Sequence, residues 1–160
     1  MAKHIYQKES ITVAEAKLKL EKFCMYQDRC HFDVTQKLNS FNLIQEAKDL
    51  ILTQLIQDNF LNEERFAKSF ARGKFYYKKW GKNKIIYELK KRNISTYNIK
   101  SALQEINETD YQNTLEELIS KKIKTIKENN PFLIKKKVAS YLNAKGYEYH
   151  LIYEKLNELL

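Results

Sequence analysis

Residues 85–94 read Ile-Ile-Tyr-Glu-Leu-Lys-Lys-Arg-Asn-Ile, and the pattern in this stretch recurs twice elsewhere in the chain. Ile85 precedes Leu89 by about one helical turn, so the two residues lie on the same helix face. Asn93 follows four residues later, and Asn tolerates the left-handed backbone that often ends a helix. The stretch is therefore typical of the end of an amphipathic helix, followed by a stop and an apolar residue, Ile94.

The pattern repeats at intervals of just over 50 residues. Three apolar columns and one Asn/Gly column align among the copies. We expect the apolar columns to be buried and the Asn/Gly column to adopt the left-handed backbone at a helix end. The columns are Val34, Ile85 and Val138; Leu38, Leu89 and Leu142; Asn42, Asn93 and Gly146; and Leu52, Leu103 and Leu156.

Helix start signals fit the same register. Two stretches, Thr12 to Glu15 and Thr109 to Gln112, have the spacing of a capping box. Asn62, Ser95 and Asn130, which precedes Pro131, are of the residue types that cap helix N-termini. We therefore expect each copy of the repeat to contain three helices.

These features predict an all-α fold of three tandem three-helix modules, forming an elongated, curved helical-repeat body. Module 1 is predicted at residues 12–61, module 2 at 62–107 and module 3 at 108–160, with an N-terminal extension at 1–11. Three glycines and one proline in 160 residues are too few for the turns of a sandwich or barrel.

Charge is concentrated in module 2. The whole chain has 29 basic and 20 acidic residues. Residues 1–61 contain 8 of each, residues 62–106 contain 12 basic and 4 acidic, and residues 107–160 contain 9 and 8. A localised basic excess indicates a polyanionic partner, since an evenly solvated surface would not show it.

The first helix of module 2 is expected to turn Phe66, Phe70, Gly73 and Tyr77 toward the core, with Gly73 allowing a neighbour to approach closely. The cations on its other side and in the following helix form the candidate binding site for nucleic acid or a protein partner. They are Arg65, Lys68, Arg72, Lys74, Lys78, Lys79, Lys82, Lys84 and Lys91.

Few of these cations have an acidic neighbour in the sequence, because Glu63, Glu64 and Glu88 are the only acids close by. We therefore expect most of them to be unpaired. The aromatic residues of the same region are Phe75, Tyr76, Tyr77 and Trp80. Such rings either stack on unpaired bases or fill a core, and the core interpretation is favoured.

The sequence contains no phosphate-binding loop, no metal-ligand spacing and no nucleophile with its base, so we expect no enzymatic activity, no cofactor and no metal. Cys24 and Cys30 are expected to be structural thiols. No stretch approaches 18 uncharged apolar residues and the first residues lack an apolar signal region, which predicts a cytoplasmic protein.

Residues 60–74, Phe-Leu-Asn-Glu-Glu-Arg-Phe-Ala-Lys-Ser-Phe-Ala-Arg-Gly-Lys, are followed by Gly81 and by the run Lys84 to Leu89. This order resembles the motif of the RecX family of recombination regulators, in which an aromatic-Leu-acidic-acidic-x-Arg-Phe-Ala run leads to a basic helix end, a Gly turn and an Ile-x-x-Glu-Leu helix. The family's three tandem three-helix modules also agree with the repeat. The resemblance therefore spans nearly the whole chain.

Within this resemblance, Arg65 and Arg72 match the motif arginines, and Lys74 stands where a second arginine is usual. The chain differs from the family pattern at Lys82, where proline is common after the turn glycine, and at Gly73, where serine is common. These differences affect the expected rigidity of the turn.

The resemblance implies a non-enzymatic modulator of the RecA recombinase that lies in the groove of the RecA filament on DNA and alters filament assembly or recombination. Inhibition is the favoured direction, with stimulation as the alternative. Its implied partners are the RecA filament and single- and double-stranded DNA, with no membrane, and its implied processes are homologous recombination, DNA repair and the SOS response. We expect a monomer. One alternative is a DNA-binding transcription regulator that uses a trihelical module like a helix-turn-helix. Another is a helical-repeat adaptor scaffold, which leaves the basic module unexplained.

Overall fold

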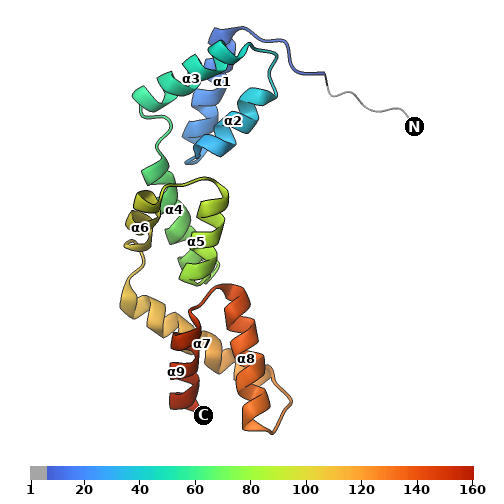
Figure 1. Ribbon diagram of the computed structural model, residues 1–160, viewed down its shortest axis with the longest axis vertical. Coiled ribbons are helices and arrows are strands. Elements are labelled where there is room, and N and C mark those ends of the chain that lie inside the picture. Colours follow the sequence, from blue (N-terminus) through green and yellow to red (C-terminus); the bar gives the residue numbers. More distant parts are fainter. Residues whose placement is uncertain (1–6) are drawn as a thin grey trace, which may run out of the picture. The chain divides into compact units, whose positions relative to one another are not determined.

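The computed structural model describes residues 7–160 and contains nine helices with no strand in that part of the chain (Figure 1). This confirms the all-α prediction. The helices are α1 (Val13–Tyr26), α2 (His31–Asn39), α3 (Gln45–Gln57), α4 (Glu63–Tyr76), α5 (Lys82–Lys91), α6 (Thr96–Leu103), α7 (Glu108–Thr125), α8 (Pro131–Lys145) and α9 (Tyr149–Leu159).

The helices belong to two units. Unit 1 ends at Phe66, and unit 2 is Ala67–Leu160. In unit 1, α1, α2 and α3 contact one another; in unit 2, α5 contacts α6, and α7, α8 and α9 contact one another. The division falls within α4, and the predicted boundaries of the three modules stay a prediction.

Most predicted N-caps are confirmed. Thr12 and Glu15 form the reciprocal bonds of a capping box, and the Asn62 side chain accepts a hydrogen bond from the Arg65 amide at 2.9 Å. The Ser95 and Asn130 side chains cap α6 and α8.

The second predicted capping box is wrong. Helix α7 is capped by Asn107, whose side chain accepts from the Asp110 amide at 3.0 Å, so Thr109 already lies within the first turn. Asn, Ser and Thr cap a helix by the same hydrogen bond, and two such residues lie close together here. The pattern indicated the helix start but placed it two residues late.

The predicted left-handed stop occurs in two of its three positions. Asn93 has φ 57° and Gly146 has φ 95°. Asn42 does not adopt this backbone, because its amide donates to the Glu9 carbonyl at 2.8 Å in a short parallel bridge between Glu9 and Phe41. Residues 1–6 of the predicted N-terminal extension lie outside the described residues.

The first two apolar columns are buried in all three copies. In the third column Leu156 is buried, whereas Leu52 and Leu103 are only half-buried. The neighbouring residues Ile51 and Ala102 are fully buried instead. The repeat register is therefore right for the middle helix of each copy, and one position off for the third helices α3 and α6.

The predicted core face of α4 is also displaced. Phe66 is buried, as predicted, but Phe70 is half-buried and Tyr77 is 87% exposed. The other buried residues of this helix are Ala67, Ala71 and Phe75. The core face was predicted from the phenylalanines, because they are large and strongly apolar, and the small alanines were overlooked.

Gly73 does not allow a close approach, contrary to expectation, because no heavy atom lies within 4 Å of an ideal Cβ built on it. Cys24 and Cys30 are buried and free, as expected of structural thiols. Burial raises the pKa of both thiols, that of Cys30 to about 11, which keeps them protonated and weakly nucleophilic at neutral pH.

Candidate nucleic-acid interface

The turn between α4 and α5 folds Trp80 back under the last turn of α4. The Trp80 amide donates to the Lys74 carbonyl at 3.0 Å. The Nζ atoms of Lys74 and Lys84 then lie 4.8 and 4.4 Å from the centroid of the Trp80 ring. The Phe70 ring meets Trp80 edge-on at 6.3 Å, and the Arg92 guanidinium lies 5.1 Å from the Phe70 centroid. We call these five residues the Trp80 cluster.

Cation–π attraction in this cluster holds the ammonium groups in place at the surface. An aromatic ring beneath a lysine gives the flexible side chain a preferred position, so a ligand anion meets charges that are already oriented. Trp80 is half-buried and carries two lysines near its ring. Its ring therefore acts here as a support for cations.

The other aromatic residues of this region separate into two kinds. Phe75 is buried, as the core interpretation expects, whereas Tyr77 is exposed. Tyr76 is 44% exposed, and its hydroxyl donates to the Asp110 carboxylate at 2.9 Å and accepts from the Asn107 amide at 3.4 Å. Tyr76 therefore connects the end of α4 to the start of α7.

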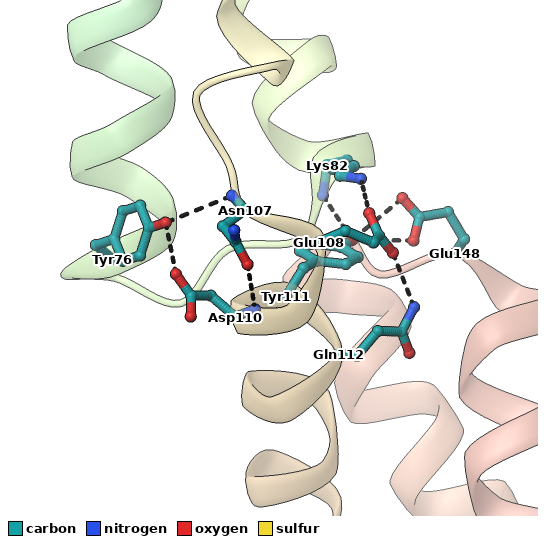
Figure 2. Close-up of polar contacts among 8 residues, drawn as sticks. All are labelled: Tyr76, Lys82, Asn107, Glu108, Asp110, Tyr111, Gln112 and Glu148. Carbon is teal, nitrogen blue, oxygen red and sulfur yellow. Dashed lines mark hydrogen bonds and ion pairs between the residues drawn. The ribbon is translucent and has the colours of Figure 1, made fainter.

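The α5 start and the α7 to α9 bundle are joined by a buried tyrosine pair. The Tyr111 and Tyr147 rings are stacked with centroids 5.2 Å apart, and Phe75 packs on Tyr111 at 5.6 Å. The Tyr111 hydroxyl donates to the Glu148 carboxylate at 2.9 Å and accepts from the Lys82 amide at 3.0 Å (Figure 2). The polar tips of buried rings are thus satisfied.

Further polar bonds surround the tyrosine pair. Lys82 Nζ donates to the Glu108 carboxylate at 2.9 Å, and Gln112 donates to the same carboxylate (Figure 2). These bonds lower the pKa of Glu108, the Gln112 amide being the larger cause and Lys82 the next. On the other side, the Tyr147 hydroxyl donates to the Lys79 carbonyl at 2.9 Å. Lys79 has φ 58°, a backbone that this contact helps to hold.

Two glycines meet at the centre of this junction. The Gly81 amide donates to the Lys145 carbonyl at 2.8 Å, and the Asn83 amide donates to the Gly146 carbonyl at 2.9 Å. A Cβ on Gly81 would lie 2.2 Å from the Gly146 carbonyl carbon, and a Cβ on Gly146 would lie 2.5 Å from the Lys84 amide. The turn is therefore fixed by backbone contact, with lysine rather than proline at position 82.

The stability of unit 2 is expected to fall above about pH 10. Burial is the largest cause that raises the pKa values of Tyr111 and Tyr147. In the unfolded chain tyrosines ionise near pH 10, so above that pH the unfolded state loses protons that the folded state retains. The contribution is present below about pH 10 and is lost above it. Urea midpoints at pH 7, 9 and 10.5 should show this drop, and the Tyr111→Phe/Tyr147→Phe variant should show a smaller one. An equal drop in both proteins would contradict the assignment.

Arg65 has a structural role that the sequence pattern did not reveal. Its Nε donates to the Asp28 carboxylate at 2.8 Å, and one terminal nitrogen donates to the Asn59 and Phe60 carbonyls at 3.1 Å. All of these residues belong to unit 1. Arg65 therefore joins the start of α4 to the loop before α2, and a charge reversal there would change folding together with any binding.

Three more predicted site residues have acidic partners. Arg72 lies 3.4 Å from Glu105, and Lys91 lies 3.8 Å from Glu88. Lys82 is bonded to Glu108 at the junction. The Lys91 pair uses Glu88, one of the acids already counted as close by in the sequence. Arg72 and Lys82 find partners that the count of nearby acids did not include, because Glu105 and Glu108 lie farther along the chain. The Arg72 and Lys91 pairs are solvent-exposed and weak, of the order of 0–1 kcal/mol.

The remaining predicted site residues lie on α4 or directly after it. Lys68 is half-buried on α4, Lys78 is exposed, and Lys79 is half-buried in the turn. The structure thus brings Lys74 and Lys84 together at Trp80, and uses Arg65 and Lys82 for internal contacts.

A second basic region was missed at the sequence level. Residues 120–145 contain eight lysines and a single acid, Glu128. The acids at the start of α7 and in α9 cancel this charge when module 3 is counted as a whole. In the structure, the Nζ atoms of Lys122 and Lys145 lie 4.7 and 5.7 Å from the Tyr141 centroid. A sliding window of about one helix length would have found the region.

Within residues 7–160, no group of three or more His, Cys, Asp or Glu side chains is placed to hold a metal ion. The same residues include no helix long and apolar enough to cross a membrane.

Comparison with known proteins identifies two parts of the chain. Residues 62–103 match the second three-helix domain of RecX, and residues 108–156 match the third three-helix domain of RecX. The chain belongs to the RecX family. The matched segments contain both the Trp80 cluster and the buried pair of Tyr111 and Tyr147.

Curated relatives named regulatory protein RecX agree with this assignment. The one from Lactobacillus gasseri is 27% identical over 84% of this chain and 51% of its own length. The one from Clostridioides difficile is 26% identical over 91% of this chain and 68% of its own length. The chain thus spans between about half and two thirds of the length of these relatives.

Solved RecX structures share the fold. The crystal structure of RecX from Lactobacillus salivarius superposes with a TM-score of 0.82 at 21% identity, covering 92% of this chain and 96% of that one. A second structure, of regulatory protein RecX, has a TM-score of 0.78 at 21% identity and covers 91% of this chain and 73% of that one.

Proposed function

We propose that this chain is a non-enzymatic regulatory protein that binds the RecA filament on DNA and inhibits recombination. Membership of the RecX family and the names of its relatives support a regulatory role. The observation that carries the proposal is the Trp80 cluster, in which cations on α4 and α5 are held at the surface of the segment that matches the second RecX domain.

In this proposal, Lys74 and Lys84 provide the main contacts, together with Lys78 and Lys79 in the turn between them. Lys68, Arg72 and Lys91 add charge at the edge, where exposed ion pairs exchange readily with a phosphate or carboxylate. Arg65 keeps its contacts within unit 1, and Lys82 keeps its contacts at the start of α5, so neither is assigned to the binding surface. The candidate site is therefore smaller than the sequence pattern predicted.

The mechanism we infer is obstruction. A basic surface is attracted to the phosphates of DNA or to acidic parts of the filament, and the attraction requires no chemical step. A protein bound there occupies space that subunit addition or strand exchange needs. In this proposal the chain acts as a monomer in the cytoplasm, where the recombinase and the DNA are found.

The proposal is tested by titrating the chain into RecA assembled on single-stranded DNA while ATP hydrolysis and filament length are measured. We expect hydrolysis to fall and filaments to shorten as the chain approaches the RecA concentration. Unchanged hydrolysis and length at equimolar chain would contradict the proposal. Tight binding to one duplex sequence without any effect on RecA would favour the helix-turn-helix alternative.

A further inference from the structure

The starting observation is a groove on the face of unit 2 formed by α7 and α8. It has a volume of about 430 Å³ and is lined by Lys122, Ile126, Lys137, Ser140, Tyr141 and Ala144. Lys122 lies near the Tyr141 ring, and Lys137 is exposed at the edge of the groove. We call this feature the Tyr141 groove. It repeats the arrangement of the Trp80 cluster, since an aromatic ring supports lysine ammonium groups in both.

Lys145 connects the Tyr141 groove to the Trp80 cluster. Its Nζ lies 5.7 Å from the Tyr141 centroid, while its carbonyl accepts the Gly81 amide at 2.8 Å. The next residue, Gly146, is in direct backbone contact with Lys84. Both ends of this connection lie in unit 2 and are fixed by the glycine contact, so the two groups of cations have a fixed relation.

The cations along this path form no close ion pairs, although Lys84 helps to lower the pKa of Glu88 and Lys137 helps to lower that of Glu128. None of Lys74, Lys84, Lys122, Lys137 and Lys145 has an ion pair within 4.0 Å among residues 7–160. Partial burial lowers the pKa of Lys145, and the charges of Lys84 and Lys79 lower it further. Like charges held together without a directly paired acid favour binding of an external anion, which removes their repulsion.

We propose that the Trp80 cluster, Lys145 and the Tyr141 groove form one continuous track for the phosphate backbone of a nucleic acid. The proposal goes beyond the function above, because it assigns a second contact surface to α7 and α8 and requires no RecA. The five unpaired cations of the track are lysines, which act as point charges and fit a sequence-independent phosphate contact, whereas Arg92 of the Trp80 cluster is paired with Glu88 at 3.0 Å.

The lining of the groove favours a nucleic acid over an acidic protein surface. Ile126, Ala144 and the Tyr141 ring provide apolar area directly beside the lysines. A nucleic acid presents sugar and base faces beside its phosphates and can cover both kinds of surface at once. A surface of carboxylates would satisfy the lysines but leave the apolar part of the groove uncovered.

The test compares variants by fluorescence anisotropy with an oligodeoxythymidine of about 30 nucleotides, longer than a typical single-strand site, and no RecA. At about 0.1 M salt, each lost phosphate contact costs about fivefold on a single strand, so Lys122→Glu/Lys137→Glu should bind at least about 25-fold more weakly. Its slope of log K against log salt should be shallower by about 1.4.

The matched control is Lys22→Glu/Lys100→Glu, which makes the same charge change at two exposed lysines outside the track. It should bind within about threefold of the unchanged chain, because salt screens the repulsion between the oligonucleotide and glutamates that lie far from it.

Two results would overturn the track. In the first, Lys122→Glu/Lys137→Glu binds the oligonucleotide as tightly as the control variant does, while Lys74→Glu/Lys84→Glu binds it weakly. That result would leave the function proposed above intact. In the second, poly-glutamate of equal charge displaces the oligonucleotide as effectively as unlabelled DNA does. That result would favour an acidic protein partner. Thermal melts of every variant exclude unfolding, and Lys122→Gln/Lys137→Gln replaces the Glu variant if that variant fails to fold.

Discussion

Gly81→Ala is expected to lower the free energy of unfolding of unit 2 by at least about 3 kcal/mol. The added Cβ would lie 2.2 to 2.3 Å from the backbone of Gly146 and Tyr147, so the two segments must separate. Gly81 has φ −73° and ψ 162°, which any residue adopts, so the effect comes from the contact alone. Separation breaks the two backbone bonds of the junction, at about 1 to 3 kcal/mol for each group left unsatisfied.

Gly73→Ala is the matched control, because it makes the same chemical change within α4 where no atom lies within 4 Å of the new Cβ. There the substitution should raise stability by about 0.5 to 1 kcal/mol, since alanine is the better helix former. Trp80 is the only tryptophan of the chain and lies in unit 2, so its fluorescence during urea unfolding reports both changes. Equal midpoints for the two variants would show that the glycine contact does not hold the junction.

Lys74→Glu/Lys84→Glu is expected to weaken binding to duplex DNA by at least about 60-fold at about 0.1 M salt. Each phosphate contact on a duplex contributes a slope of about −0.9 in log K against log salt, which corresponds to about eightfold per contact at that salt concentration. The reversed charges add repulsion, so the loss should be larger at lower salt and smaller at higher salt. Competition binding with random-sequence duplexes at several salt concentrations measures both effects.

Lys74→Arg/Lys84→Arg is the conservative control, because it retains both charges and the possibility of stacking on Trp80. It should bind within a few-fold of the unchanged chain. A Glu variant that binds as tightly as the Arg variant would remove the Trp80 cluster from the proposed site. A Glu variant whose melt is also lowered would show that the lysines support the fold, and the Arg variant then decides whether charge alone matters.

The sequence predicted the helical class and the repeat because the middle helix of each copy contains strong, periodic signals. The columns at Leu38, Leu89 and Leu142 combine a large apolar residue with a nearby stop, and all three are buried. The third column failed at Leu52 and Leu103, because several apolar residues in a short helix satisfy more than one register. The burial of alanine on α4 was not predicted, because alanine is only weakly apolar and contributes little to a periodic hydrophobic pattern.

The candidate site was predicted only in part, because charge pairing depends on contacts between distant segments. The cations of α4 and α5 were found as a group, but the partners Asp28, Glu105 and Glu108 come from elsewhere in the chain. Helical periodicity carries no information about such contacts. The glycine junction was likewise missed, since it depends on the position of Gly146 beside Gly81. The second lysine group was missed for a different reason, because its charge was counted over the whole of module 3.

Co-sedimentation with preformed RecA filaments on single-stranded DNA tests the central claim most directly. At about 0.1 M salt the unchanged chain is expected to pellet with the filaments and to stay in solution with RecA that lacks DNA and nucleotide. Lys74→Glu/Lys84→Glu should stay in the supernatant although its melting curve is unchanged. Equal pelleting of the two proteins, or no pelleting of either, would contradict the claim that this chain regulates RecA through the cationic surface of α4 and α5.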